Sequence, residues 1–279
     1  MQKCYLCNHP AQIFLKVKNK SILRCNNCKL TYTRDLASFN GIIREDGEKF
    51  VREYLKEASL YKEYFDSIIK IILKHKKPQS LLDVGCGVGI FLQKVKDIGW
   101  NAIGVDMSKA AVQYARSRGL DVRLGKIEEL KFKPRSFDVI TLFQTIEHIE
   151  DPIRILKKIY SLLRRGGILI LTTPSEESFM ARVLGKFWFG YRNIEHLYFF
   201  NNQSLATMQT KVGFRKVMIH SEDSRVLSVP WVLTRVFEYY YNQKSLLTSL
   251  MLKSKPYWKY LNWFTFREPD VNLVSIAVK

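Results

Sequence analysis

Four of the five cysteines form two closely spaced pairs near the start of the chain. Two residues separate Cys4 from Cys7, and two separate Cys25 from Cys28. Four thiolates with this spacing can close a tetrahedral zinc site that has no open position, so such a site is structural rather than catalytic. A segment of about 40 residues rarely folds on core burial alone, and a bound metal supplies the missing stability. We predict a zinc-binding module over residues 1–39.

Two histidines stand in motifs that suit proton transfer. His148 lies in the run Ile146–Pro152, and His196 follows directly after Glu195. Histidine titrates near neutral pH and often serves as a general base, which a hydroxyl or an acidic C–H group needs before it can attack an electrophile. We predict His196, His148 and Glu195 as the catalytic residues. The alternative for His148 is a helix cap or a loop brace, and the alternative for His196 is a core position or a lid brace.

A glycine-rich turn follows the first apolar run of the central region. The stretch from Leu81 to Gly89 reads LLDVGCGVG and leads into a helical pattern. Glycines let the backbone approach a ligand closely, and a helix N-terminus adds free N–H donors. Asp106 ends the next apolar run about 20 residues further on, where a carboxylate can accept the ribose hydroxyls of a nucleoside. The alternative for Asp106 is a helix cap, a role that Ser108 can fill instead.

The elements that must position these residues alternate between strand and helix from Ser80 onward. The expected strands are 81–84, 102–105, 121–124, 137–143, 168–172, 213–220 and 271–278. The expected helices are 90–98, 109–118, 152–163 and 203–212. This alternation predicts an α/β fold with a largely parallel sheet and helices on both of its faces.

Two further segments complete the predicted organisation. Residues 40–78 form a helical linker or cap, because apolar residues recur there at helical spacing. Residues 79–279 form the main domain, and an aromatic and basic insert at about 226–266 separates its last two strands. The insert is too long for an ordinary loop. We expect a lid or a dimer interface there, and peripheral contact with an anionic membrane is the alternative.

Four motifs in this order resemble those of the class I S-adenosylmethionine-dependent methyltransferases that act on small molecules. They are LLDVGCGVG (81–89), GVDMS (104–108), SFDVITLFQTIEHIEDP (136–152) and LLRRGGILILTTP (162–174). The ubiquinone-biosynthesis O-methyltransferases share this layout. The resemblance implies a Rossmann-like sheet of seven strands, joined here to a small zinc-ribbon-like module, with S-adenosyl-L-methionine across the carboxyl ends of the strands.

The resemblance also implies which residues hold the cofactor. The methionine half would lie on the glycine turn, with Phe143 and Gln144 beside it. The ribose would bind Asp106, and the adenine would pack on Met107 and Ile127. Lys126 stands where relatives usually carry an aspartate that contacts the adenine. The complete implied set is Asp83, Gly85, Cys86, Gly87, Asp106, Met107, Ile127, Phe143 and Gln144.

The stretch around His196 resembles a pattern of sugar and polysaccharide methyltransferases, including sugar C-methyltransferases with an N-terminal zinc domain. Asn193 stands where their motif has a tyrosine, and Tyr191 is the nearest substitute. We therefore expect a small-molecule or glycan acceptor and O-methylation with a histidine base. The alternative is a zinc-containing rRNA base methyltransferase, which the net charge of +19 favours because phosphate contacts supply most nonspecific affinity.

The N-terminus lacks a long apolar stretch, and no run in the chain approaches the ~20 apolar residues of a membrane-spanning helix. Paired cysteines in a chain without a signal peptide indicate metal binding rather than disulfides. We therefore expect a cytoplasmic protein.

Overall fold

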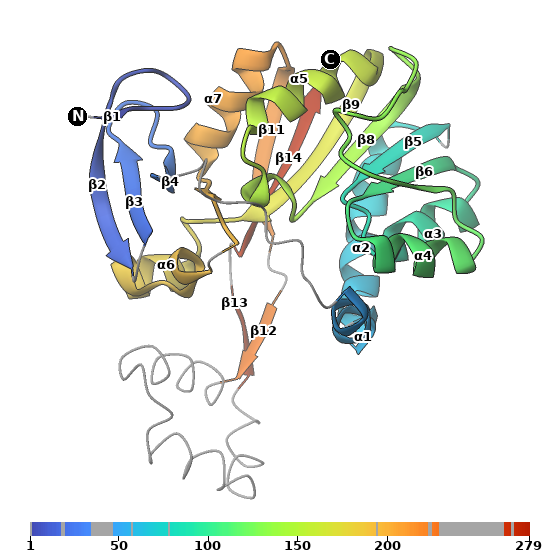
Figure 1. Ribbon diagram of the computed structural model, residues 1–279, viewed down its shortest axis with the longest axis horizontal. Helices are drawn as coiled ribbons and strands as arrows, with labels where there is room; N and C mark the ends of the chain where they lie inside the picture. The colour runs from blue at the N-terminus through green and yellow to red at the C-terminus, as the bar shows by residue number, and fades with distance from the viewer. Residues whose placement is uncertain are drawn as a thin grey trace, which may run out of the picture.

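The computed structural model describes residues 2–17, 20–34, 47–56, 58–77, 79–193, 195–222, 225–228, 265–268 and 271–279. Within these residues the strands form three sheets, of seven, five and two strands (Figure 1). The large sheet has the order β11-β14-β9-β8-β5-β6-β7. Among the described residues, no helix combines the length and the apolar character that crossing a bilayer requires.

The central strands of the large sheet are parallel. They are β5 (Ser80–Val84), β6 (Asn101–Asp106), β7 (Val122–Leu124), β8 (Phe137–Phe143) and β9 (Leu163–Pro174). The chain runs outward from β5 to β6 and β7, and then returns to β8 on the other side of β5. Ligands of open α/β sheets bind at such a reversal, beyond the carboxyl ends of the strands.

Two antiparallel strands complete this sheet. β14 (Asn272–Val278) pairs with β9, and β11 (Arg215–Glu222) pairs with β14. The predicted seven-stranded α/β fold is therefore confirmed. β9 begins at Leu163, earlier than the expected 168, because Leu163 pairs with Phe137 before the register shifts ahead of Val139.

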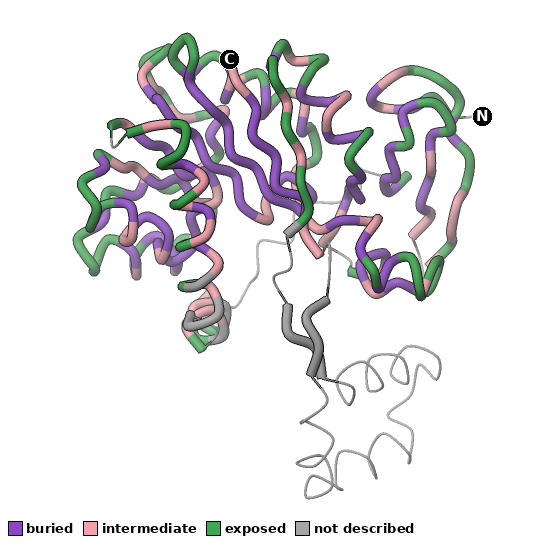
Figure 2. The backbone as a smooth tube through the Cα atoms, turned by 180° about the vertical axis from the view of Figure 1, so that it is seen from behind, coloured by how far each residue is buried: buried purple, intermediate pink, exposed green. Residues whose placement is uncertain are grey.

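Helices cover both faces because successive strand residues point to opposite sides. Leu82 and Ile140 pack with α5 (Pro152–Leu162) and α7 (Asn202–Val212). Leu81 and Val139 pack with α2 (Ala58–His75) and α3 (Ile90–Asp97) on the other face. β8 is buried along its whole length, and β5 and the second half of β9 beside it are almost entirely buried (Figure 2).

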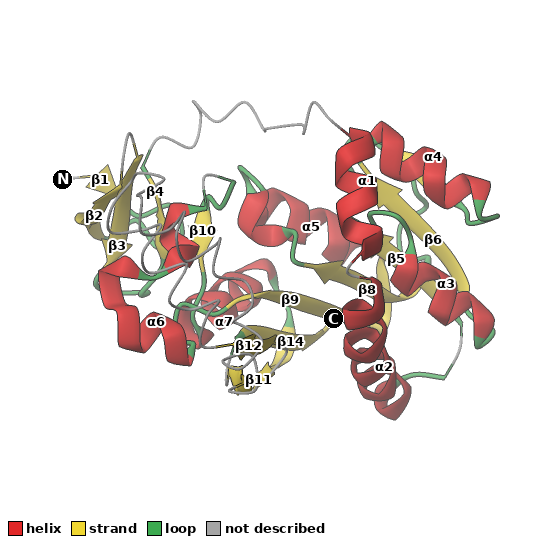
Figure 3. Ribbon diagram, turned by 90° about the horizontal axis from the view of Figure 1, so that it is seen from below, coloured by secondary structure: helices red, strands yellow, loops and turns green. Residues whose placement is uncertain are grey.

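The predicted helical segment before the sheet forms two helices in the described residues. α1 (Gly47–Lys56) packs against α4 (Lys109–Ser117), and α2 packs against α3 (Figure 3). A Cβ on Gly47 would lie 2.9 Å from the Cβ of Ala110, so glycine permits this close approach. α1 is thereby held beside the carboxyl ends of β5 and β6.

The N-terminal strands form the five-stranded sheet, in the order β1-β2-β3-β4-β10. The strands are β1 (Gln2–Lys3), β2 (Pro10–Val17), β3 (Lys20–Cys25), β4 (Thr31–Thr33) and β10 (Tyr198–Phe199). The last strand comes from the stretch after β9, where Tyr198 pairs with Tyr32. One buried apolar cluster spans both sheets, from Leu6 through Tyr198 to Leu205.

The predicted insert lies mostly outside the described residues. Its two ends are described as strands, β12 (Arg225–Ser228) and β13 (Thr265–Glu268). They pair antiparallel, with Ser228 opposite Thr265. The chain therefore leaves and re-enters the fold through one two-stranded ribbon between β11 and β14 (Figure 1).

Candidate active site and cysteine cluster

The glycine turn between β5 and α3 places backbone N–H groups at the carboxyl end of the sheet. Gly85 has φ 76°, and a Cβ there would lie 2.4 Å from Thr145 Oγ1. Gly87 has φ 53°, and the nearest atom to a Cβ there is a ring carbon of Tyr54 at 4.0 Å. The turn is therefore closed on the Thr145 side and open above Gly87, which suits a ligand lying over the backbone.

Asp106 joins this turn to the next strand. Its carboxylate accepts hydrogen bonds from the backbone N–H groups of Gly87 and Ser108, both at 2.8 Å. Ser108 caps α4 itself, because its hydroxyl accepts the N–H of Ala111. Burial raises the pKa of Asp106, and the two N–H donors act in the opposite direction.

Asp83 is a buried carboxyl group at the end of β5. The hydroxyl of Thr141 donates to its Oδ1 at 2.7 Å. Burial raises the pKa of Asp83 to about 7, and the nearby charge of Asp106 adds to the rise. A ligand with a positive charge next to Asp83 would stabilise the ionised form.

The two residues expected beside adenine differ in exposure. The side chain of Met107 is 46% exposed, whereas that of Ile127 is buried. The side chain of Cys86 packs into the core with Leu92 and Val112, away from solvent. Only the backbone of Cys86 can therefore face a ligand at the turn.

Phe143 and Gln144 end β8. The ring of Phe143 packs against Phe65 and Phe91 at centroid distances of 5.5 and 4.8 Å. Gln144 has φ 45°, and its amide donates to Asn272 Oδ1 at 3.2 Å. The chain leaves the strand sharply at Gln144, which turns the following residues toward the end of the sheet.

Sequence reasoning missed Tyr54, although its helical spacing placed it on the inner face of α1. Its ring stacks on Tyr61 at a centroid distance of 4.5 Å and covers the open side of Gly87. Burial raises the pKa of Tyr54, and so do the nearby charges of Tyr61, Asp83 and Asp106. The helix α1 thus places an aromatic ring beside the glycine turn, and this contact between distant segments has no signal in the local sequence pattern.

The two predicted histidines lie together just beyond β8. Their ring centroids are 4.9 Å apart, with the rings nearly perpendicular. His148 belongs to a short helix, η2 (Ile146–His148), and its Nδ1 contacts the backbone carbonyl of Glu195 at 3.0 Å. A carbonyl only accepts, so Nδ1 of His148 carries a proton, and in the neutral ring the lone pair lies on Nε2.

His196 is held by Asn193, the residue that replaces the expected tyrosine. The Asn193 carbonyl oxygen accepts the N–H of Glu195, so its amide nitrogen donates to His196 Nε2 at 2.9 Å. Tyr191 instead contacts Arg24 and Glu176. The structure brings the backbone of Glu195 into the site through the contact with His148.

Glu147 is a buried acid in this group that sequence reasoning did not select. Its Oε2 accepts from the hydroxyl of Thr173 at 3.0 Å, and its Oε1 has no hydrogen-bond partner among the described residues. Oε1 lies 3.9 Å from His148 Nε2. Burial raises the pKa of Glu147. Its position directly before His148 was visible in the sequence, but its burial was not.

The N-terminal sheet holds the backbone of His196. Lys20 donates to the carbonyl of His196 and, at 3.1 Å, to that of Asn193. Thr33 donates its hydroxyl to the carbonyl of His196 at 3.4 Å and its N–H to that of Leu197 at 2.8 Å. Burial lowers the pKa of Lys20 to about 8. The cysteine-bearing sheet therefore supports the loop of His196 directly.

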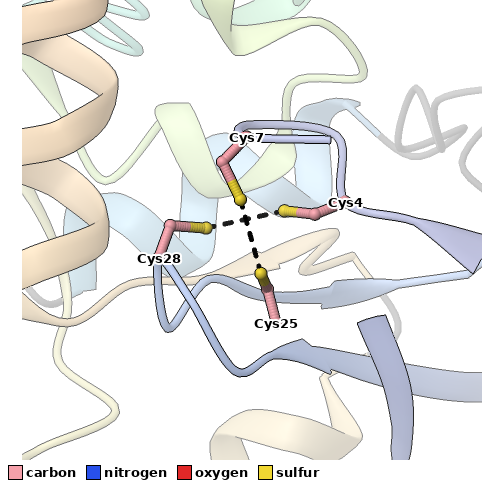
Figure 4. Close-up of side chains that lie close together, drawn as sticks. All are labelled: Cys4, Cys7, Cys25 and Cys28. Atoms are coloured by element: carbon pink, nitrogen blue, oxygen red, sulfur yellow. Dashed lines mark hydrogen bonds between the residues drawn. The ribbon is translucent and has the colours of Figure 1, made fainter. Parts of the chain in front are cut away.

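The four cysteine sulfurs point toward one another from two turns (Figure 4). The Cys4–Cys28 and Cys7–Cys25 sulfur distances are both 3.5 Å, and all four sulfurs lie within 4.8 Å of one another. Tetrahedral Zn–S bonds of about 2.3 Å place sulfurs about 3.8 Å apart, whereas a disulfide needs about 2.05 Å. The geometry fits a four-thiolate zinc ion.

The sheet order, the glycine turn and Asp106 at the end of β6 are those of a class I methyltransferase fold. The "Methyltransferase domain" family, Methyltransf_23, matches residues 52–219. The chain therefore belongs to a family of methyltransferase domains.

Relatives that carry a functional name match about a third of the chain. A probable S-adenosylmethionine-dependent methyltransferase of Mycolicibacterium smegmatis is 33% identical over 36% of this chain and 40% of its own length. A ubiquinone biosynthesis O-methyltransferase of Xanthomonas campestris is 35% identical over 33% of this chain and 42% of its own. An uncharacterized protein of Methanocaldococcus jannaschii is 27% identical over 61% of this chain and 81% of its own. The chain thus spans less than half of the two relatives that carry a functional name.

Solved structures share the fold at low identity. A methyltransferase of Thermotoga maritima, described as a possible histamine N-methyltransferase, has a TM-score of 0.56 at 22% identity and covers 86% of this chain and 99% of its own. Phosphoethanolamine N-methyltransferase 2 of Haemonchus contortus, solved with S-adenosyl-L-methionine, has a TM-score of 0.56 at 18% identity and covers 88% of this chain and 60% of its own.

Proposed function

We propose that this methyltransferase methylates a hydroxyl oxygen of a small-molecule or glycan acceptor, and that the acceptor is activated at the pair formed by His148 and His196. The observation that carries the proposal is the contact between His148 Nδ1 and the Glu195 carbonyl just beyond β8, which leaves the lone pair of the neutral ring on Nε2. In the simplest form, one imidazole takes the hydroxyl proton. Glu195 acts through its backbone.

The cofactor supplies a methyl group on a positively charged sulfur. We propose that Asp83 and the backbone of Gly85, Cys86 and Gly87 hold its methionine half, beside Phe143 and Gln144. Asp106 receives the ribose hydroxyls, since its oxygens keep lone pairs beyond the two N–H bonds. Met107 and Ile127 contact the adenine, and the exposure of Met107 supports this.

We also propose that Cys4, Cys7, Cys25 and Cys28 hold a structural zinc ion. The support is the convergence of four thiols with spacing close to that of zinc ligands. Such a site has no open position for a substrate.

The rRNA alternative rests on the net charge of +19. Phosphate contacts require basic side chains on the surface around the cleft, and a basic chain also suits nucleotide-linked sugars. Membrane contact through 226–266 concerns residues mostly outside the described part of the chain. The histidine pair is a geometric observation that supports a hydroxyl acceptor. The rRNA acceptor and the membrane contact have no comparable support in the described residues.

The test is methyl transfer from labelled S-adenosylmethionine to a panel of nucleotide sugars, free glycans, phenols and rRNA. We expect label on a hydroxyl of a small acceptor and a loss of at least about 100-fold in kcat for His148→Gln. His75→Gln is the matched control, because His75 is exposed at the end of α2. Label on an rRNA base with no small acceptor would establish the alternative function.

A further inference from the structure

Glu147 and His148 place two hydrogen-bond acceptors face to face. Glu147 Oε1 is buried and has no hydrogen-bond partner in the part of the chain that the structure describes, and His148 Nε2 lies 3.9 Å from it. That distance is too long for a hydrogen bond. Two metal bonds of about 2.1 Å span about 3.4 Å in tetrahedral geometry and at most about 4.2 Å. The two atoms are therefore too far apart to share a hydrogen bond, but their separation suits a metal ion bound between them.

The surroundings of both groups are those of metal ligands. The Nδ1–H of His148 is bound to a backbone carbonyl, which fixes the tautomer that presents Nε2 to a metal. The other oxygen of Glu147 is held by Thr173. Burying a carboxylate with an unpaired oxygen is costly, and a cation removes that cost.

His196 supplies a third group. Three atoms, namely one ring nitrogen of His196, one ring nitrogen of His148 and one carboxylate oxygen of Glu147, all lie within 4.8 Å of one another. Binding at about 2.1 Å requires the three side chains to close by about an ångström. His196 is partly exposed and comes from a loop, so it can make most of this movement.

We propose that Glu147, His148 and His196 bind a divalent first-row metal ion, separate from the four-cysteine site. Two imidazoles and one carboxylate suit Mn²⁺, Fe²⁺ or Zn²⁺ and leave open positions. These open positions accept oxygen ligands. The acceptor hydroxyl that is to be methylated would therefore bind the metal through its oxygen.

The inference rests on the proposed function for the identity of the acceptor. It replaces the histidine base with a metal ion as the group that activates the hydroxyl. The metal lowers the pKa of the coordinated hydroxyl, which releases its proton to water. The resulting oxygen anion attacks the methyl carbon; the O–C bond forms as the C–S bond breaks, and S-adenosylhomocysteine leaves with the electron pair.

Mn²⁺ is the probe, because nitrogen and oxygen ligands accept it while four thiolates favour zinc. The full-length protein, with its cysteine site loaded with zinc, is titrated with Mn²⁺ and the free ion is followed by electron paramagnetic resonance. Metal analysis after dialysis counts the bound ions. We expect wild type to bind one ion more than Glu147→Gln or His196→Gln, and each variant to bind Mn²⁺ at least tenfold more weakly.

His75→Gln is the control and should bind like wild type. His196→Gln changes a partly exposed side chain, so it tests the site even if Glu147→Gln fails to fold; thermal melting reports on folding of both. Wild type that binds no ion beyond the cysteine site, or a folded variant that keeps wild-type affinity, would overturn the proposal.

Metal binding is measured without any acceptor, so its failure is distinct from that of the proposed function. Methylation of a hydroxyl that persists without a second metal would leave the histidine base as the activating group. If the protein binds the metal but methylates only an rRNA base, the metal site is supported and the proposed hydroxyl acceptor is wrong.

Discussion

The carboxylate of Asp106 combines a structural role with a proposed role in cofactor binding. It fixes the glycine turn through the N–H groups of Gly87 and Ser108, and we propose that it binds the ribose. We expect Asp106→Ala to weaken S-adenosylmethionine binding at least tenfold, which is about 1.4 kcal/mol. Isothermal calorimetry measures this. Asp121→Ala is the control, because Asp121 is an exposed aspartate just before β7. Equal affinity in Asp106→Ala and wild type would remove Asp106 from the cofactor site.

Asp83 predicts a pH dependence of cofactor binding. Its pKa of about 7 in the free protein means that it is largely protonated below neutral pH. The cofactor's ammonium group favours the ionised form, so binding releases a proton below pH 7 and none well above it. We expect affinity to rise by up to about tenfold per pH unit from pH 5.5 to 7 and then to level off.

Calorimetry in buffers of different ionisation enthalpy checks the proton release. Asp83→Asn should bind more weakly and lose this pH dependence. A pH profile that is flat in wild type would show that Asp83 is already ionised in the free protein.

At this scale the sequence identified groups better than it identified their orientation. The motif around His148 predicted an imidazole beyond the fourth strand of the sheet. The lone pair on Nε2 depends on a carbonyl 47 residues away, which no local pattern encodes. Cys86 lies in the predicted turn, but its side chain faces the core. Glu147 is a candidate ligand because its side chain is buried, and burial is a property of the folded protein that the local sequence does not show.

At the scale of elements, the edge of the N-terminal sheet holds the loop of His196. Lys20 and Thr33 both donate to the carbonyl of His196. We expect Lys20→Met combined with Thr33→Val to lower kcat at least about tenfold and to leave cofactor affinity within about twofold, because a misplaced catalytic group costs rate rather than cofactor binding. Lys16→Met, on the neighbouring strand, is the matched control.

Steady-state kinetics and calorimetry on the same preparations measure the two effects. A double variant with normal kcat would show that the loop holds its conformation without the sheet.

The order and type of the elements of the main sheet followed from periodicity, because strands with buried residues on both faces alternate with amphipathic helices. The early start of β9 did not follow, since it requires Leu163 to pair with Phe137 across a register shift. β10 was also missed. It has two residues, Tyr198 and Phe199, and its strand character comes entirely from the partner Thr31–Thr33.

For the whole molecule, we propose residues 1–39, 40–78 and 79–279 as sequence units. The shared sheet and the shared apolar cluster nevertheless join the first and the last of these units. We expect Cys25→Ser to lower the melting temperature of the entire chain by about 10 °C, since a loss of roughly 3 kcal/mol shifts Tm by about 2–4 °C per kcal/mol at this size. Scanning calorimetry should show one transition.

Cys86→Ser is the matched control, because Cys86 is a buried cysteine outside the cluster. It should shift Tm by much less. A separate low-temperature transition in Cys25→Ser, with the main one unchanged, would mean that the N-terminal sheet unfolds alone.

The fifth strand of the N-terminal sheet also sets an order of events during synthesis. β4 leaves the ribosome early, but its partner β10 follows roughly 165 residues later. At about 5–20 residues per second, the edge of β4 waits on the order of ten to thirty seconds for that partner. An unpaired strand edge invites pairing with other chains. Metal capture by the four cysteines, which are all translated before β4, can fix the turns of the nascent module through this interval.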